Sequence, residues 1–208
     1  RVTPTSVENV FETIETILTE GNEQVLFIWD SLANTPTETD VAGTYNPSES
    51  IGVKARILSK AMAKLTVPLN ETDSTFLVLN QLKQKITRDM ADLLVDPWTA
   101  PGGKSMHYAS SLRIYLTGRK GKASYIYDDN NFKIGSETKA KIKKSRFGTE
   151  GREAFFKIMW GDDVFIEDEL SLFEAIKGKS DKMTSAGAWY TLVHTDGTKE
   201  KFQSKQWN

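Results

Sequence analysis

The chain has 208 residues, of which 38% are apolar and 26% are charged, so it can bury one sizeable core and is not a wholly disordered chain. It contains no cysteine, which excludes disulfides, thiolate metal sites and cysteine nucleophiles and fits a reducing compartment. No apolar run approaches the roughly 18 residues of a membrane span, so we expect no membrane partner.

The charges are unevenly distributed, although the net charge is only −1. Residues 1–103 carry 8 basic and 14 acidic side chains, residues 104–146 carry 11 and 3, and residues 147–208 carry 8 and 11. The chain as a whole therefore has no positive field to attract nucleic acid, but a local basic segment lies between acidic flanks.

The first predicted element is a helix. Apolar residues recur at helical spacing from Val7 to Leu18, with Thr5 or Ser6 as the expected N-cap and Gly21 beyond the end. The continuous apolar run VLFIW (25–29) follows, and it is typical of a strand that is covered on both faces of a parallel sheet.

The next elements predict a βαβ unit. Residues 34–50 are polar and rich in Thr, Pro and Gly, which indicates a mobile surface loop. Helical spacing returns from 51 to 65, and FLVL (76–79) is a second buried strand. Because such units are right-handed and parallel, the carboxyl ends of both strands should face the same rim.

The second half of the chain predicts an antiparallel region. Residues 82–106 form a long connection without a clear secondary-structure pattern, and short links at GRKGK and DDNN predict antiparallel neighbours among the strands that follow. These strands are expected at 112–116, 123–127, 139–144 and 154–160, before a short amphipathic helix at 169–177 and a hairpin at 186–202 that turns at Asp196-Gly197.

Four polar residues follow the two predicted parallel strands. Asp30 and Ser31 end the first strand, and Asn80 and Gln81 end the second. Open α/β sheets bind ligands beyond these ends, where an acid can hold Mg²⁺ and an amide can sense a phosphate, so the set suits a nucleoside triphosphate. The alternative is that Asp30 only caps the following turn, and spacing alone does not separate the two.

The segment PGGKS (101–105) has the appearance of a phosphate-binding loop. The motif G-x-x-x-x-G-K-[ST] requires a glycine at position 98, which is Trp98. The segment also follows no apolar strand, so we reject it as a P-loop.

The basic segment predicts two cationic strand faces, with Lys139, Lys141 and Lys143 on one and Lys144 and Arg146 on the other. The alternative is a solvated sheet edge that lysines protect from aggregation. The long connection adds further cations and Trp98, which can stack on a base, and Gly102-Gly103, which can admit a phosphate backbone. These features together are typical of a single-strand nucleic-acid surface.

The order of these features strongly resembles the ATP-dependent recombinases of the RecA family, from about residue 5 to about residue 192. The matching segments are VLFIWDSLA, IGVKARILSKAMAKL, FLVLNQLKQKI, PGGKSMHYASSLRIYL, GSETKAKIKKSRF and AGAWY. The resemblance implies an α/β RecA-type ATPase core with a central, mostly parallel sheet flanked by helices and an antiparallel extension. Residues 1–160 would be the C-terminal portion of this core, and residues 161–208 the beginning of a small C-terminal α+β domain.

The resemblance implies a cytoplasmic protein of a bacterial or phage-infected cell. It would be a subunit of a helical homo-oligomeric filament on single-stranded DNA, with ATP and Mg²⁺ between protomers. The filament pairs its strand with homologous double-stranded DNA and exchanges strands, and the whole protein would be a DNA-dependent ATPase.

Six residues match nucleotide positions of the family. Asp30, with Ser31 beside it, matches the acid that holds Mg²⁺ through water. Gln81, with Asn80, matches the amide that senses the γ-phosphate and passes that state to the DNA-binding loop. The remaining two, which match basic residues that reach across to a neighbour's ATP and neutralise its phosphates, are Lys144 and Arg146.

The resemblance also assigns a DNA-binding surface. Residues 37–50 match the family's first DNA-binding loop, and residues 83–105 match the second, whose Gly-Gly pair contacts the DNA backbone. The expected DNA-binding residues are Arg56, Ser59, Lys83, Lys85, Arg88, Trp98, Gly102, Gly103 and Lys104.

The family's polymerisation segment, P-loop and catalytic glutamate precede the part that this chain matches, so we expect the 208 residues alone to be inactive as an ATPase. One alternative is a non-catalytic DNA-binding or filament-capping protein that has lost its ATPase half. Another is a helicase or clock-type relative, although GSETKAKIKKSRF and AGAWY favour the recombinases.

Overall fold

The structure is a computed structural model. It describes residues 1–208 except 22, 88–89, 96, 119–123, 161–163, 168, 170–171, 174–175, 178 and 208. The chain divides into two compact units, Arg1–Ser111 and Leu112–Asn208. The predicted domain boundary near residue 160 stays a prediction.

The first unit opens with the predicted helix, α1 (Val7–Glu20). Ser6 is its N-cap, and its hydroxyl accepts a hydrogen bond from the Asn9 amide at 3.1 Å. The Gly21 amide donates to the Ile17 carbonyl at the other end. Capping and spacing therefore place this helix where the sequence predicts it.

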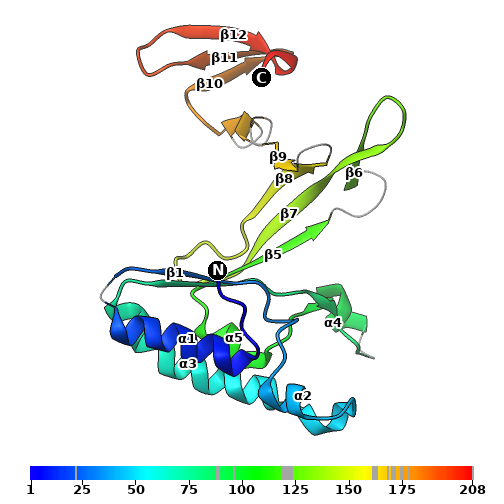
Figure 1. The fold of residues 1–208 in the computed structure, drawn as a ribbon. Coiled ribbons are helices and arrows are strands. Elements are labelled where there is room, and N and C mark those ends of the chain that lie inside the picture. The colour runs from blue at the N-terminus through cyan, green and yellow to red at the C-terminus, as the bar shows by residue number, and fades with distance from the viewer. Residues whose placement is uncertain are drawn as a thin grey trace. The chain divides into compact units, whose positions relative to one another are not determined.

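A parallel pair of strands, β1 (Leu26–Trp29) and β2 (Thr75–Val78), forms the sheet of this unit. The helix α3 (Val53–Glu71) connects them, and α1 and α3 lie side by side along one face of the pair (Figure 1). This confirms the predicted βαβ unit. The core between helices and sheet consists of Val7, Val10, Phe11, Ile14, Leu18, Trp29, Leu32, Leu58 and Leu65.

The other face of the β1–β2 pair is apolar and exposed. Leu26 and Ile28 of β1 are 59% and 61% exposed, and Leu77 of β2 is 49% exposed. The sequence predicted β1 to be covered on both faces, and this is wrong in the structure: the run is continuously apolar, but helices cover only the side that holds Trp29.

Short elements fill the two long connections of the first unit. The first contains α2 (Glu38–Ala42) and the 3-10 helix η1 (Pro47–Ser50). The second contains an antiparallel ribbon of β3 (Lys83–Gln84) and β4 (Trp98–Thr99), with α4 (Met90–Val95) between its strands and α5 (Gly103–Ala109) after it.

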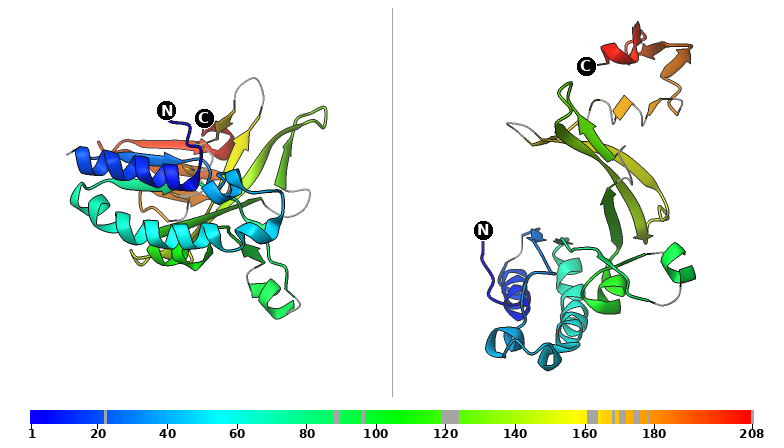
Figure 2. Two further views of the ribbon diagram at one scale, coloured as in Figure 1. Left: turned by 60° about the horizontal axis from the view of Figure 1, so that its bottom comes forward. Right: turned by 90° about the vertical axis from the view of Figure 1, so that its right-hand side faces the viewer.

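The second unit contains a five-stranded antiparallel sheet around the long strand β7 (Figure 2). Among the described residues, β5 and β6 each pair with a different stretch of β7 rather than with each other. The predicted DDNN turn is confirmed, because the Asp128 amide donates to the Phe132 carbonyl. The strands are β5 (Leu112–Gly118), β6 (Tyr125–Tyr127), β7 (Lys133–Ser145), β8 (Glu153–Met159) and β9 (Phe165–Ile166).

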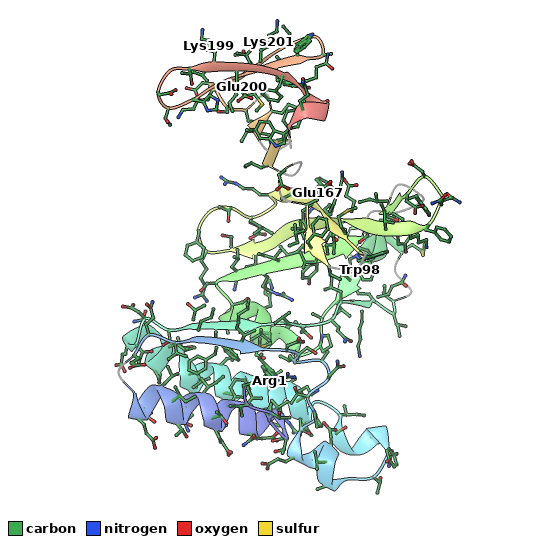
Figure 3. The ribbon with its side chains drawn as sticks, turned by 45° about the horizontal axis from the view of Figure 1, so that its top comes forward. Arg1, Trp98, Glu167, Lys199, Glu200 and Lys201 are labelled. Atoms are coloured by element: carbon green, nitrogen blue, oxygen red, sulfur yellow. The ribbon has the colours of Figure 1, made fainter. Side chains whose placement is uncertain are left out.

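A three-stranded antiparallel sheet follows, made of β10 (Met183–Ala186), β11 (Trp189–Val193) and β12 (Lys199–Gln203), with η3 (Ser204–Gln206) at its end. The predicted turn at Asp196-Gly197 is confirmed, with Gly197 at φ 86°. Figure 3 shows Lys199 and Lys201 on one side of β12 and Glu200 on the other, as strand alternation requires.

This sheet has a small core of its own, formed by Phe173, Met183, Tyr190 and Phe202. Phe173 is 1% exposed and packs edge-on against Tyr190, with ring centroids 4.9 Å apart. Part of the predicted helix at 169–177 lies outside the described residues.

The mixed α/β class is confirmed. No helix in the described part of the chain combines the length and apolar character needed to cross a membrane.

Candidate functional site

The carboxyl ends of β1 and β2 meet at one rim, as predicted. The Leu79 amide donates to the Trp29 carbonyl at 2.9 Å, and the Leu32 amide donates to the Leu79 carbonyl at 3.0 Å. Asp30 and Ser31, joined by a cis peptide bond, therefore lie across from Leu79, the residue before Asn80, and the Asp30 side chain is exposed. The structure thus brings the polar residues of both strand ends together.

Asn80 and Gln81 differ in their surroundings. The Asn80 side-chain amide donates to the Pro101 carbonyl at 2.8 Å, and its oxygen accepts from the Gln81 amide at 2.9 Å. Asn80 therefore ties the far end of the second long connection to the end of β2. Gln81 is exposed at the point where that connection begins.

The donor set at this rim fits Mg²⁺ that is held with the help of a phosphate. Among the described residues, no three or more His, Asp or Glu side chains gather into a metal cluster. Mg²⁺ commonly keeps several waters and takes one or two carboxylates plus phosphate oxygens, so the exposed Asp30 carboxylate beside the Ser31 hydroxyl suffices for such a role.

The first predicted DNA-binding loop is not the unstructured loop that the sequence suggests. Thr37 and Asp40 form a capping box at the start of α2, in which the Thr37 amide donates to the Asp40 carboxylate at 2.8 Å. The hydrogen bond from the Thr37 backbone amide, followed by the bond from the Thr37 hydroxyl, holds the pKa of the Asp40 carboxyl below its ordinary value. The prediction of a mobile loop is therefore corrected at this end of the segment.

Lys54, at the start of α3, holds the beginning of the same connection. Its ammonium donates to the Thr35 carbonyl at 2.6 Å, and burial lowers its pKa. The Trp29 indole also donates to the Thr35 hydroxyl at 3.0 Å. Sequence reasoning missed Lys54, because its partners are backbone carbonyls 19 and 22 residues earlier.

The second predicted DNA-binding loop contains the β3–β4 ribbon. Lys83 and Trp98 lie on opposite strands of it, paired with Thr99 and Gln84 respectively, and Trp98 is half-buried (labelled in Figure 3). Lys83 and Lys104 are exposed, Lys85 is half-buried, and Arg88 lies outside the described residues.

The Gly102-Gly103 pair packs closely on α3. Gly102 has φ 104°, and a Cβ there would lie 3.0 Å from Met106 Cγ and 3.1 Å from Leu58 Cδ1. A Cβ on Gly103 would lie 3.2 Å from that of Ala55. The two glycines are therefore required by packing at the base of the connection, in addition to any role in binding.

Arg56 and Ser59 lie three residues apart on α3, and both side chains are exposed. Leu58 and Leu65 of the same helix are buried in the core. The helix thus offers these two polar residues to solvent while its apolar face holds it in place.

Lys144 and Arg146 lie in the second unit, at the end of β7. A β-bulge shifts the register between β5 and β7, so Ile114 pairs with Ile142 but Arg113 pairs with Lys144. Lys144 therefore shares the face of Arg113. The prediction that Lys144 lies on the opposite face from Lys139, Lys141 and Lys143 is wrong, because the extra residue cancels one step of alternation.

Partial desolvation lowers the pKa of Lys144, and the neighbouring charges of Arg146 and Arg113 lower it further. Lys144 and Arg146 are thus close enough to repel each other, and their proximity favours an anionic ligand. Arg113 is a further member of this group that sequence reasoning missed, because only the bulge shows which residue it faces.

The chain is similar to known proteins along most of its length. Residues 2–165 match the family model described as the RecA N-terminal domain. The chain is 31% identical over 189 residues to Protein RecA of Streptococcus agalactiae serotype III, 29% over 191 residues to that of Streptococcus sanguinis, and 28% over 204 residues to that of Haemophilus ducreyi. These alignments cover 90%, 90% and 98% of this chain but 47%, 47% and 51% of the relatives, so the chain spans about half of their length.

Proposed function

Because the chain belongs to the RecA family, we propose that it is part of an ATP-dependent recombinase that assembles as a filament on single-stranded DNA and exchanges strands with homologous duplex. The family match over residues 2–165 carries this proposal. The shared rim of Asp30, Ser31, Asn80 and Gln81 supports it, since open α/β sheets bind ligands beyond the carboxyl ends of adjacent strands.

In the proposed mechanism, Asp30 with Ser31 holds Mg²⁺ through water, and Gln81 contacts the γ-phosphate. The ion neutralises charge on the phosphates when ATP is bound. Asn80 links this rim to the DNA-binding connection through its bond to Pro101, so a shift of Gln81 on ATP binding is transmitted to residues 83–105. Lys144 and Arg146 supply positive charge to a neighbour's ATP.

The proposed DNA surface joins the two connections, 37–50 and 83–105, with Arg56 and Ser59 of α3. The cations neutralise phosphates, and Trp98 stacks on a base. The setting we propose is the cytoplasm of a bacterial or phage-infected cell. No G-x-x-x-x-G-K-[ST] sequence occurs in the 208 residues, so we propose that ATP hydrolysis needs a phosphate loop outside them.

The test is joint-molecule formation between circular single-stranded DNA and homologous linear duplex, with ATP and Mg²⁺. The protein used is the product of the complete reading frame that encodes this chain. We expect joint molecules from the wild type and their loss in Gln81→Ala, with ATP affinity retained. Binding to single-stranded DNA without ATP hydrolysis or joint molecules would overturn the proposal in favour of the non-catalytic DNA-binding alternative.

A further inference from the structure

One face of the β5–β7 pair carries a tyrosine with two cations near its ring. The Arg113 guanidinium donates to the Tyr115 hydroxyl at 3.4 Å, and its central carbon lies 5.5 Å from the centre of the tyrosine ring. The Lys143 ammonium lies 5.5 Å from the same centre. Cations at this distance are attracted to the electron-rich face of the ring, so Tyr115 holds both in one place.

The bulge adds one more cation, Lys144, to this group. Lys143 and Lys144 together face the single residue Arg113, so three cations converge where a regular strand would present two. The charge of Arg146 also acts on Lys144, more strongly than that of the acid Glu150. Positive charge therefore outweighs negative charge around Lys144.

Two lysines earlier in the same strand are paired with an acid. Glu153 of β8 forms ion pairs with Lys139 at 3.1 Å and with Lys141 at 2.9 Å. These bonds hold the pKa of Glu153 below its ordinary value. The basic segment is thus not a uniform stripe, because Lys139 and Lys141 share one carboxylate, whereas the bulge brings Lys143 and Lys144 to Arg113.

We infer that Arg113, Tyr115 and Lys143 extend Lys144 and Arg146 into one site for a compact polyphosphate, the terminal phosphates of a nucleotide, with Tyr115 as the positioning residue. This rests on the proposed function, which assigns only Lys144 and Arg146 to that ligand. A guanidinium binds phosphate through a bidentate fork and an ammonium acts as a point charge, so the group offers both modes.

A DNA backbone carries the same phosphate chemistry, but the geometry favours the compact ligand. A backbone needs cations spread along its path, whereas Lys139 and Lys141, which would continue the path along β7, are held by Glu153. Arg113 and Lys143 instead lie near one ring, and Lys144 lies opposite Arg113.

The test measures binding of inorganic tripolyphosphate to the 208-residue chain by calorimetry at low salt. We expect saturable binding that weakens more than about tenfold in Lys144→Ala/Arg146→Ala and about three- to tenfold in Tyr115→Leu. Tyr115→Phe keeps the ring and should restore most of the affinity. The matched control is Tyr125→Leu, which removes another ring with a lysine over it, Lys133 at 3.9 Å, and should leave binding unchanged.

The variants test the role of Tyr115 separately from the role of the Lys144 and Arg146 pair. Wild-type affinity in Tyr115→Leu, with loss in Lys144→Ala/Arg146→Ala, would overturn the inference and leave the proposed role of the basic pair intact. Wild-type affinity in the double variant would overturn both. An oligothymidylate that binds the same site more tightly than tripolyphosphate, and loses affinity in the same variants, would assign the site to DNA and overturn the choice of a nucleotide.

Discussion

Gly102 illustrates how one residue can serve both packing and binding. Its backbone lies at φ 104°, in the region that favours glycine, and its α-carbon faces the side chains of Met106 and Leu58. The resemblance to the family assigns it a DNA contact. The structure adds a reason for glycine that would hold without DNA.

We predict that Gly102→Ala destabilises the chain by about 2–4 kcal/mol, from the unfavourable φ and from overpacking against α3. The control is Gly52→Ala, where φ is 74° but a Cβ would meet nothing within 4 Å, so only about 1–2 kcal/mol is expected. Urea denaturation measures both. Equal losses would show that the space around Gly102 relaxes without cost.

At the scale of elements, the connection between β1 and α3 departs most from its sequence prediction. Its composition suggests a mobile loop, yet Thr37 is 0% exposed and caps α2 together with Asp40. A helix of five residues shows no helical period, so only the Thr-x-x-Asp spacing could have revealed it. The contacts to Lys54 and Trp29 depend on tertiary structure and leave no local signal.

We predict that the start of α2 loosens in acid. The folded pKa of Asp40 lies below its ordinary value of 3.8, so its stabilising effect is complete above that value and is lost as the pH falls through the folded pKa. Amide hydrogen exchange of residues 37–42 between pH 6 and pH 2 should reveal this loss. The Asp40→Asn variant should lack it, and an identical acid transition there would assign it to another group.

The β3–β4 ribbon carries the prediction for DNA. We expect Trp98→Ala combined with Lys83→Ala to weaken binding of a single-stranded oligonucleotide by at least about tenfold, through loss of stacking. The slope of the logarithm of the binding constant against the logarithm of the salt concentration should also become shallower by about 0.7, which is the contribution of one phosphate contact on a single strand. Fluorescence anisotropy at several salt concentrations measures both.

The matched control for this ribbon is Lys64→Ala, which removes a cation of the same unit that is bonded to Glu15 at 2.6 Å. The Lys64→Ala variant should leave the affinity for the oligonucleotide within about twofold of the wild type. Exposed ion pairs contribute little to stability, so the fold should also be retained. Unchanged affinity in the Trp98 and Lys83 double variant would remove the ribbon from the DNA site.

At the scale of the whole molecule, the sequence predicts the class of fold, the βαβ unit and most of the antiparallel strands. Continuous apolar runs and turn residues are local signals, which is why β1, β2, the DDNN turn and the Asp196-Gly197 turn are found where expected. The face of Lys144 and the exposure of Leu26 could not be predicted, because a bulge and the cover of a sheet depend on partners distant in sequence.

Each unit has its own core, and this leads to a prediction about Phe173. Its side chain is 1% exposed within the core of the three-stranded sheet, so Phe173→Ala should cost about 3–5 kcal/mol there. Hydrogen exchange should show lost protection in β10–β12 while α1 keeps its protection. Loss of protection in α1 as well would mean that the two cores unfold together.

The bulge in β7 also determines which length changes the strand can tolerate. Deleting Lys143 would remove the extra residue and leave Ile142 opposite Ile114 and Lys144 opposite Arg113, so every side chain would keep its face. Deleting Ala140 instead would move every β7 side chain on one side of the deletion to the opposite face of the sheet. Lysines there would then take the positions of apolar residues, and apolar residues those of lysines. Natural variants of this strand that differ in length by one residue should therefore carry the change at the bulge.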